Sequence, residues 1–130
     1  MHRNFRKPAL TTAPGATGIV KLRNAVRRFF GPDAELVNAK NIRVNGQLRG
    51  VSGFLKYKDG RFVYFNTERS VYNPMSDKFL FRAARDEKDY SGGCNCLCNA
   101  TLEDLLSAIY DLLCMQAGPE SGWQKNVWVW

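Results

Sequence analysis

Histidine is nearly absent from this sequence, because His2 is the only one among 130 residues. A Ser-His-Asp triad, a Cys–His pair and a histidine metal site each need an imidazole beside the reacting group. His2 lies in a terminal stretch for which no fixed structure is expected. The carboxylates fall where turns and helix starts explain them, as at Asp59 and Glu103. The sequence therefore predicts that this protein is not an enzyme and carries no resident cofactor.

Long apolar runs and common signature motifs are also missing. No stretch approaches the roughly 20 apolar residues that cross a bilayer. No apolar run follows the cations Arg3, Arg6 and Lys7, as it would in a secretory signal. The chain has neither G-x-x-x-x-G-K-S/T nor G-x-G-x-x-G, so no motif supports a nucleotide-binding fold. These absences predict a cytoplasmic protein with no membrane contact.

Cysteine is scarce and clustered: Cys94, Cys96 and Cys98 lie within five residues, and Cys114 is the fourth. Residues two apart in a strand point the same way but lie too far apart for a disulfide, which favours reduced thiols. Together with Cys114, three thiols on one strand face could hold zinc or an iron–sulfur cluster. The C-x-C spacing differs from the usual zinc knuckle, so the alternative is a set of small buried hydrophobic residues.

Charge is distributed unevenly along the chain. Residues 1–65 hold 13 Lys and Arg against 3 Asp and Glu, whereas residues 66–130 hold 6 against 9. The formal net charge of +7 therefore comes from the N-terminal half. A basic half of this kind predicts contact with a polyanion or with an acidic patch on a partner.

Two segments have the three- and four-residue apolar spacing of amphipathic helices. The first is residues 17–30, with Thr17 as the expected N-cap and Gly31-Pro32 as the stop. The second is residues 101–115, with Thr101 or Asn99 as the cap. The apolar stripe of the first helix is expected at Ile19, Leu22, Val26 and Phe29. The stripe of the second is expected at Leu102, Leu105, Leu106, Ile109, Leu112 and Leu113.

Between the helices, two turn dipeptides predict an antiparallel meander. Asn45-Gly46 and Asp59-Gly60 each suit a two-residue type I′ turn between strands. Such a turn at Asp59-Gly60 pairs Tyr57 with Phe62. The predicted core face then carries Leu55, Tyr57, Phe62 and Tyr64. The opposite face then carries Phe54, Lys56, Lys58, Arg61, Val63 and Phe65.

Further strands are expected at Lys78–Ala83 and at residues 124–130, with a bulge or bend near Gly50 and Gly53. The fold class that follows is α+β: an antiparallel β-meander of four to five strands with two helices packed on it. The N-terminal helix is basic and the C-terminal helix is amphipathic. Residues 1–16 are expected to form a flexible basic arm, and residues 17–130 a single domain.

The candidate binding residues combine the cations of the N-terminal half with two aromatic residues. Cations pair with phosphates, and nucleic-acid bases stack on exposed aromatic rings. The alternative for the two aromatics is burial beneath the N-terminal helix. The candidates are Lys21, Arg23, Arg27, Arg28, Arg43, Arg49, Lys56, Lys58, Arg61, Phe54 and Phe65.

A separate candidate is the charged segment that begins in the Lys78–Ala83 strand. Arg82, Arg85 and Lys88 precede Ser91-Gly92-Gly93, where the backbone amides of a Gly-rich turn can hold an anion. The alternative is a solvated loop held by local ion pairs.

The function predicted from these features is non-enzymatic binding of nucleic acid, or of a nucleic-acid-handling complex, through the basic N-terminal half. A small basic protein without catalytic residues could act as a stoichiometric inhibitor, by analogy with those of phages and mobile elements. One alternative is a protein–protein interaction module that meets an acidic partner surface. Another is a sponge for a small phosphorylated nucleotide, bound by Arg and aromatic residues between protomers.

Overall fold

The computed structural model of the protein describes residues 11–13, 16–68, 78–91 and 94–115. Most of the expected basic arm and the strand expected at residues 124–130 lie outside these residues. Thr11–Thr12, which fall within the expected arm, form a short strand that pairs in parallel with Gln47–Leu48.

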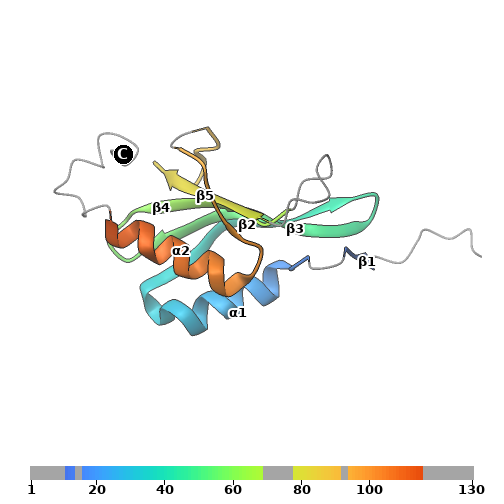
Figure 1. The fold of residues 1–130 in the computed structure, drawn as a ribbon, viewed down its shortest axis with the longest axis horizontal. Helices are drawn as coiled ribbons and strands as arrows, with labels where there is room; N and C mark the ends of the chain where they lie inside the picture. Colours follow the sequence, from blue (N-terminus) through green and yellow to red (C-terminus); the bar gives the residue numbers. More distant parts are fainter. Residues whose placement is uncertain (1–10, 14–15, 69–77, 92–93, 116–130) are drawn as a thin grey trace, which may run out of the picture.

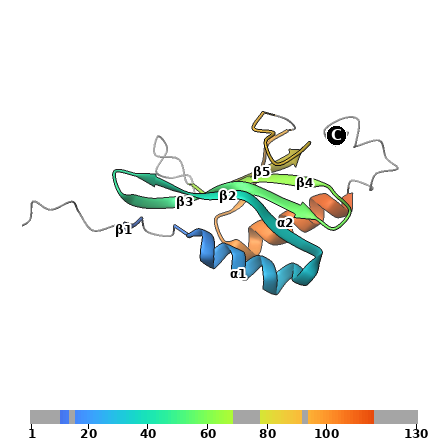
Figure 2. The same ribbon diagram turned by 180° about the vertical axis from the view of Figure 1, so that it is seen from behind.

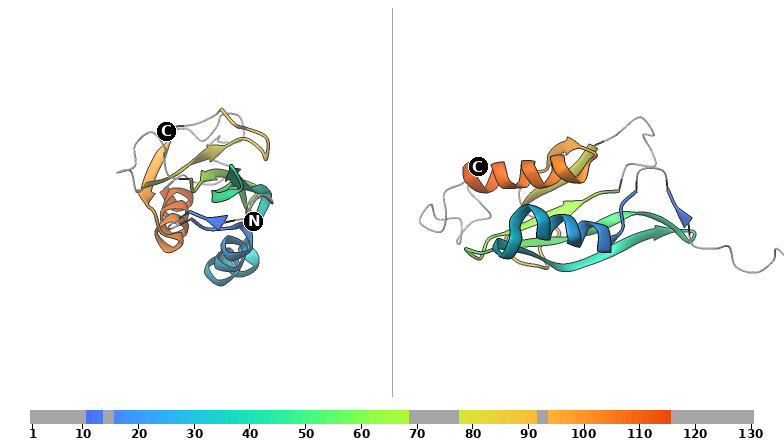
Figure 3. Two further views of the ribbon diagram at one scale, coloured as in Figure 1. Left: turned by 90° about the vertical axis from the view of Figure 1, so that its right-hand side faces the viewer. Right: turned by 90° about the horizontal axis from the view of Figure 1, so that it is seen from below.

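The described residues form one sheet with two helices on one of its faces (Figure 1). The elements are β1 (Thr11–Thr12), α1 (Ile19–Phe30), β2 (Ala34–Val44), β3 (Gln47–Tyr57), β4 (Phe62–Asn66), β5 (Lys78–Ala84), β6 (Cys96–Asn99) and α2 (Leu102–Met115). Strands β2 to β6 pair antiparallel in chain order, and β1 extends the sheet beside β3. Seen from below the sheet, both helices lie in front of the strands (Figure 3). The predicted α+β class, with both helices packed on the sheet, is confirmed.

The N-cap of α1 is Gly18, one residue later than the predicted Thr17, and the first turn is capped from the sheet. The Ile19 amide donates a hydrogen bond to Asn41 Oδ1 on β2 (2.8 Å), and Thr17 makes no cap. The buried face carries Leu22, Ala25, Val26 and Phe30. Phe29, which was predicted in the apolar stripe, is 45% exposed. The stripe therefore passes through Phe30, whose side chain reaches the core at the end of the helix.

Helix α2 matches its prediction closely. The Thr101 Oγ1 accepts a hydrogen bond from the Asp104 amide (3.1 Å), so Thr101 is the N-cap. The leucine and isoleucine stripe is buried against the sheet and α1, with Ile109 and Leu105 fully inaccessible. Within the described residues, neither helix is long and apolar enough to cross a membrane.

The β3–β4 hairpin differs from its predicted register by one residue. Tyr57 pairs with Arg61: the Tyr57 amide donates to the Arg61 carbonyl (2.8 Å), and the Gly60 amide donates to the Tyr57 carbonyl (2.9 Å). The loop thus has three residues, and Gly60 takes a positive φ of 94° at the position where such loops need it. Lys56 consequently pairs with Phe62, where the prediction had Tyr57.

That one-residue shift moves every side chain of β4 to the other face of the sheet. Val63 and Phe65 join Leu55 in the core beneath the helices, contrary to the prediction. Phe62 and Tyr64 instead lie with Phe54 and Lys56 on the opposite face. Figure 2 shows the sheet from behind, with both helices on its lower side and its upper face left open by them. The predicted core pairing of Tyr57 with Phe62 is therefore wrong.

Strands β2 and β3 depart from a regular ladder at two places, as the glycines suggested. One register shift lies between Val37 and Lys40, where Asn38 has a positive φ of 51°. The other lies between Ile42 and Arg43, opposite the region of Gly50. At the tip, Asn45 and Gly46 both have positive φ, which confirms the predicted two-residue turn.

Candidate functional site

The outward face of α1 carries the densest group of cations that the sequence pointed to. Lys21, Arg23, Arg27 and Arg28 are all exposed, and Ile19–Phe30 contains no acidic residue. The three ion pairs found in the described part of the chain all lie elsewhere. Among the four cations of α1, Lys21 and Arg28 lie beside α2, and Arg23 and Arg27 lie on the far side of the helix. Helix α1 therefore presents four cations to solvent.

The cations of the sheet do not join that surface. Arg43 and Arg49 flank the β2–β3 turn, whereas Lys56 lies near the other end of β3, about 20 Å away at the rise of a strand. Lys56 Nζ sits 5.9 Å from the Phe62 ring centroid on the open face. Lys58 Nζ lies 3.4 Å from Asp33 Oδ2, and this carboxylate raises the pKa of Lys58.

Arg61 is a structural residue, although the sequence placed it among the contact candidates. It is only 4% exposed. Its Nε and NH2 groups donate to Asp59 Oδ2 (2.9 and 2.8 Å), and its NH1 group donates to the Leu113 carbonyl (3.0 Å). The shifted register explains the burial of Arg61. With Tyr57 paired to Arg61, the Arg61 side chain falls on the core face of the sheet and reaches the C-terminal turn of α2.

Phe54 and Phe65 are both buried, but on opposite faces of the sheet. Phe65 is 1% exposed and belongs to the core beneath the helices. Phe54 is fully buried on the open face, with its ring centroid 5.4 Å from that of Tyr64 and 5.3 Å from that of Tyr90. Neither ring is available to stack a base, and only Phe65 is covered by helices.

The cysteines are free thiols that the fold separates into two groups. Cys96 and Cys98 pack against the core, and Cys94 is exposed just before β6. Cys114 is exposed in the last turn of α2, whereas Cys98 just precedes that helix, so the helix length separates them by about 18 Å. No group of three or more potential ligands among the described residues could hold a metal ion. The structure thus does not bring Cys114 to the other thiols.

Thiol reactivity should follow this division. Burial raises the pKa of Cys96, and burial together with Asp104 raises the pKa of Cys98 from 9.0 to about 11. We expect a thiol reagent at neutral pH to modify the exposed Cys94 and Cys114 quickly and Cys96 and Cys98 slowly, because the thiolate is the reactive form. Peptide mass spectrometry over time would measure each site.

The pH dependence of Cys98 provides the control. Its modification rate should rise about tenfold per pH unit between pH 7 and 9 without a plateau, since the thiolate is a minor species there. A folded pKa above the unfolded value stabilises the fold below pH 9, and this contribution is lost as the pH rises towards 11. Equal rates for Cys94 and Cys98 at pH 7 would contradict the burial of Cys98.

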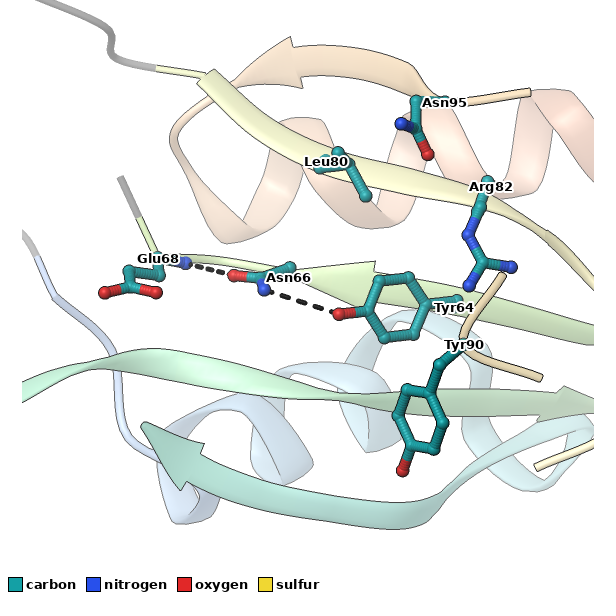
Figure 4. A pocket seen from close by; sticks show the side chains of 7 residues that line it. All are labelled: Tyr64, Asn66, Glu68, Leu80, Arg82, Tyr90 and Asn95. Atoms are coloured by element: carbon teal, nitrogen blue, oxygen red, sulfur yellow. Dashed lines mark hydrogen bonds between the residues drawn. The ribbon is translucent and has the colours of Figure 1, made fainter. Parts of the chain in front are cut away.

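A pocket of about 340 Å³ lies on the open face of the sheet (Figure 4). Its lining comes from β4 and the residues just after it, from β5, and from the segment between β5 and β6. The lining residues are Tyr64, Asn66, Glu68, Leu80, Arg82, Tyr90 and Asn95. Arg82 is 4% exposed, and its guanidinium carbon lies 4.6 Å from the centroid of the Tyr64 ring. The pocket thus combines a buried cation with aromatic, amide and carboxylate groups.

Sequence reasoning identified Arg82 as a possible anion contact but missed Tyr64, which it assigned to the core. The signal that could have found Tyr64 is Gly60, because glycine as the third loop residue is typical of a three-residue hairpin with positive φ. With that loop length, Tyr64 falls opposite Arg82 on the open face. Asn66 and Leu80 follow as the next pair along the same face.

Comparisons of the chain with models of protein families, with curated proteins and with solved structures gave no match.

Proposed function

We propose that this protein binds nucleic acid, alone or within a nucleic-acid-handling complex of the cytoplasm, through the outward face of α1 and without catalysing a reaction. The observation that carries the proposal is the group of four exposed cations on a helix without a carboxylate. Lys21 and Arg28 are seven positions apart, so the cations extend over about 10 Å of helix axis. That length matches several successive phosphates of a strand, which are spaced about 3.4 Å apart along duplex DNA.

Binding of this kind depends on the sugar–phosphate backbone. Arginine and lysine contacts to phosphates position a protein on nucleic acid but read no sequence. Between its cations, the exposed face of α1 offers Val20 and Asn24. We therefore expect little sequence preference. We also expect the affinity to fall steeply with added salt, because salt reduces the free energy gained when binding releases counterions from the phosphates.

The test compares two double variants that each remove two exposed positive charges. Arg23→Gln with Arg27→Gln changes α1, and Arg43→Gln with Lys56→Gln changes the sheet. Binding of labelled single- and double-stranded DNA and RNA would be measured between about 50 and 200 mM salt. For duplex DNA, log affinity falls with log salt, and the α1 variant should make this slope less steep by about 2, whereas the sheet variant should leave it close to wild type.

Thermal unfolding of both variants would show that each remains folded. Equal losses of affinity in the two variants would contradict a contact made by α1 in particular. No binding by the wild-type protein even at about 50 mM salt would overturn the proposal.

A second candidate function is recognition of an acidic protein surface at the groove between α1 and α2. This groove has a volume of about 340 Å³, and its lining combines the apolar Phe29, Leu102 and Leu106 with polar residues that include Glu103 on the α2 side. Lys21 and Arg28 line its α1 side. A carboxylate flanking an apolar side chain would complement that pattern. Loss of a protein partner in Lys21→Gln with Arg28→Gln, but not in the Arg23 and Arg27 variant, would favour this function over nucleic acid.

A further inference from the structure

The pocket on the open face lies across the sheet from the helices and is separate from the surface proposed to bind nucleic acid. Its volume is at the lower end of the range of about 300–1,000 Å³ seen for small-molecule sites. In Figure 4 the Arg82 guanidinium points towards the ring of Tyr64, and Glu68 lies at the opposite end of the row of side chains. The chemistry at these two ends is different.

At one end, Arg82 is a buried cation that makes no direct ion pair among the described residues, and the Asp89 carboxylate acts on it only from beyond ion-pair distance. Its NH1 group donates to the Ala83 carbonyl (3.2 Å) and its NH2 group donates to the Asp89 carbonyl (2.7 Å). A guanidinium has five N–H donors, so three have no acceptor among the described residues. No carboxylate of those residues lies within ion-pair distance of Arg82. Burial lowers the pKa of Arg82, although the group keeps its charge.

The direct contacts of this buried charge are neutral carbonyls and a ring, which makes its burial costly. The Asp89 carboxylate, which accepts from the Arg85 and Ser91 amides, offsets only part of that cost, so an anion in direct contact would supply what is missing. A carboxylate or a phosphate fits the planar fork of donors and can accept two of them at once. Tyr64 fixes the plane of the fork, because the cation lies over its ring. The free donors of Arg82 therefore point to an organic anion.

The segment at residues 85–91 holds the wall of the pocket in place. Asn38 Nδ2, from the bulge of β2, donates to the Glu87 carbonyl (2.8 Å) and to the Tyr90 hydroxyl (3.1 Å). The Tyr90 ring meets those of Phe54 and Tyr64 edge to face, yet Tyr90 remains 52% exposed. Its outer surface is thus a fixed apolar wall against which a planar ring could pack.

At the other end, the pocket offers acceptors. Asn66 Nδ2 donates to the Tyr64 hydroxyl (3.4 Å), and Asn66 Oδ1 accepts from the Glu68 amide (2.8 Å). Glu68 has no cation within ion-pair distance in the part of the chain that the structure describes. With respect to the described residues, its carboxylate can therefore accept from a donor such as an exocyclic amine.

We propose that this pocket binds a small organic anion that carries a planar ring. The carboxylate or phosphate of the ligand pairs with Arg82, the ring packs against Tyr90 and Leu80, and a donor on the ring reaches Glu68. Nucleoside monophosphates and aromatic carboxylates both combine an anionic group with a planar ring. They differ in whether that group is a phosphate or a carboxylate, and in the hydrogen-bond donors on the ring.

The experiment is calorimetry with thermal shift on the full chain, using AMP, GMP, CMP, UMP and 4-aminobenzoate as probes. Adenosine supplies a ring without the anion, and ribose 5-phosphate supplies the anion without the ring. We expect at least one complete probe to bind one to one with a Kd below about 1 mM. Both half-probes should bind at least about tenfold more weakly. A phosphate or a carboxylate preference would identify the anion.

Variants separate this site from its surroundings. Arg82→Gln should abolish binding, and Asn95→Asp, at an exposed position of the rim, should weaken it about tenfold by like-charge repulsion. Glu68→Gln should weaken only probes that carry an amine. Arg43→Gln is the matched control, because that side chain is exposed beside the β2–β3 turn and does not line the pocket.

Asn95→Asp leaves the core untouched, so it tests the site even if Arg82→Gln fails to fold. No binding of any probe at about 1 mM, or equal affinity in wild type and Asn95→Asp, would overturn the inference. The Arg23 and Arg27 variant should keep its affinity for the small anion. Failure of nucleic-acid binding would therefore leave this site standing, and the reverse also holds.

Discussion

Gly53→Ala is expected to lower the free energy of unfolding by about 3 kcal/mol, because the added methyl group has no space. A Cβ at this position would lie 2.5 Å from the Cα and 2.6 Å from the Cβ of Ala39. Ala39 belongs to the bulge of β2, which the positive φ of Asn38 folds across β3 at this point. Relief of the overlap would require the backbone of β2 to move, and β2 also supplies the Asn41 cap of α1. Urea unfolding followed by circular dichroism would measure the loss.

Gly18→Ala is the control for adding the same methyl group. Its Cβ would meet the flexible Leu48 Cδ2 at 3.3 Å and Asn41 Oδ1 at 3.7 Å, and no backbone atom is that close. We expect a loss of about 1 kcal/mol or less, the usual cost of alanine in place of glycine at an N-cap. If the two variants unfolded at the same urea concentration, the close approach of β2 and β3 would be wrong.

Arg61→Met should lower the free energy of unfolding by about 3 kcal/mol, although it removes only one positive charge from a basic protein. The substitution removes the side-chain N–H donors to the Leu113 carbonyl and to Asp59 Oδ2, and only the Arg61 backbone amide still donates to Asp59 Oδ1. It also disconnects the β3–β4 loop from the last turn of α2, two places that are 52 residues apart in the chain. Urea unfolding at low and high salt would measure the effect, which should change little with salt because the pair is largely buried.

Lys58→Met provides a neighbouring comparison in the same loop. Lys58 forms an ion pair with Asp33 and also lies over the Tyr57 ring, and the side chains of the ion pair are largely exposed at 58% and 44%. Such pairs contribute little, so the unfolding midpoint should stay close to that of the wild type. A larger loss at Lys58 than at Arg61 would contradict the structural role of Arg61. The comparison also matters for function, because impaired nucleic-acid binding in an Arg61 variant would follow from unfolding.

Much of the fold could be predicted from local patterns. The stripe from Leu102 to Leu113 determined α2, and Thr101 with Asp104 determined where it begins. Asn45-Gly46 determined the β2–β3 turn, since both residues must adopt positive φ there. These features depend on neighbours in the sequence, so the residues themselves carry the information.

The sites were harder to predict, because a single residue in one loop determines the face of every side chain that follows. Treating Asp59-Gly60 as a two-residue turn placed Tyr64 in the core and Arg61 on the surface, and both placements were wrong. The sequence pattern also does not show what covers each buried phenylalanine. Phe54 is covered by Tyr64 and Tyr90, whereas Phe65 is covered by the helices.

The sequence by itself determined the α+β class, the two helices and a basic N-terminal half whose α1 cations face solvent. Only the tertiary structure decided which cations are buried, since that depends on partners remote in the chain. Arg61 meets Leu113, and Arg82 lies in a pocket completed by Tyr64 and Tyr90. The physical reason is that propensity and turn chemistry act between neighbours, whereas burial is determined by how the strands and helices pack together.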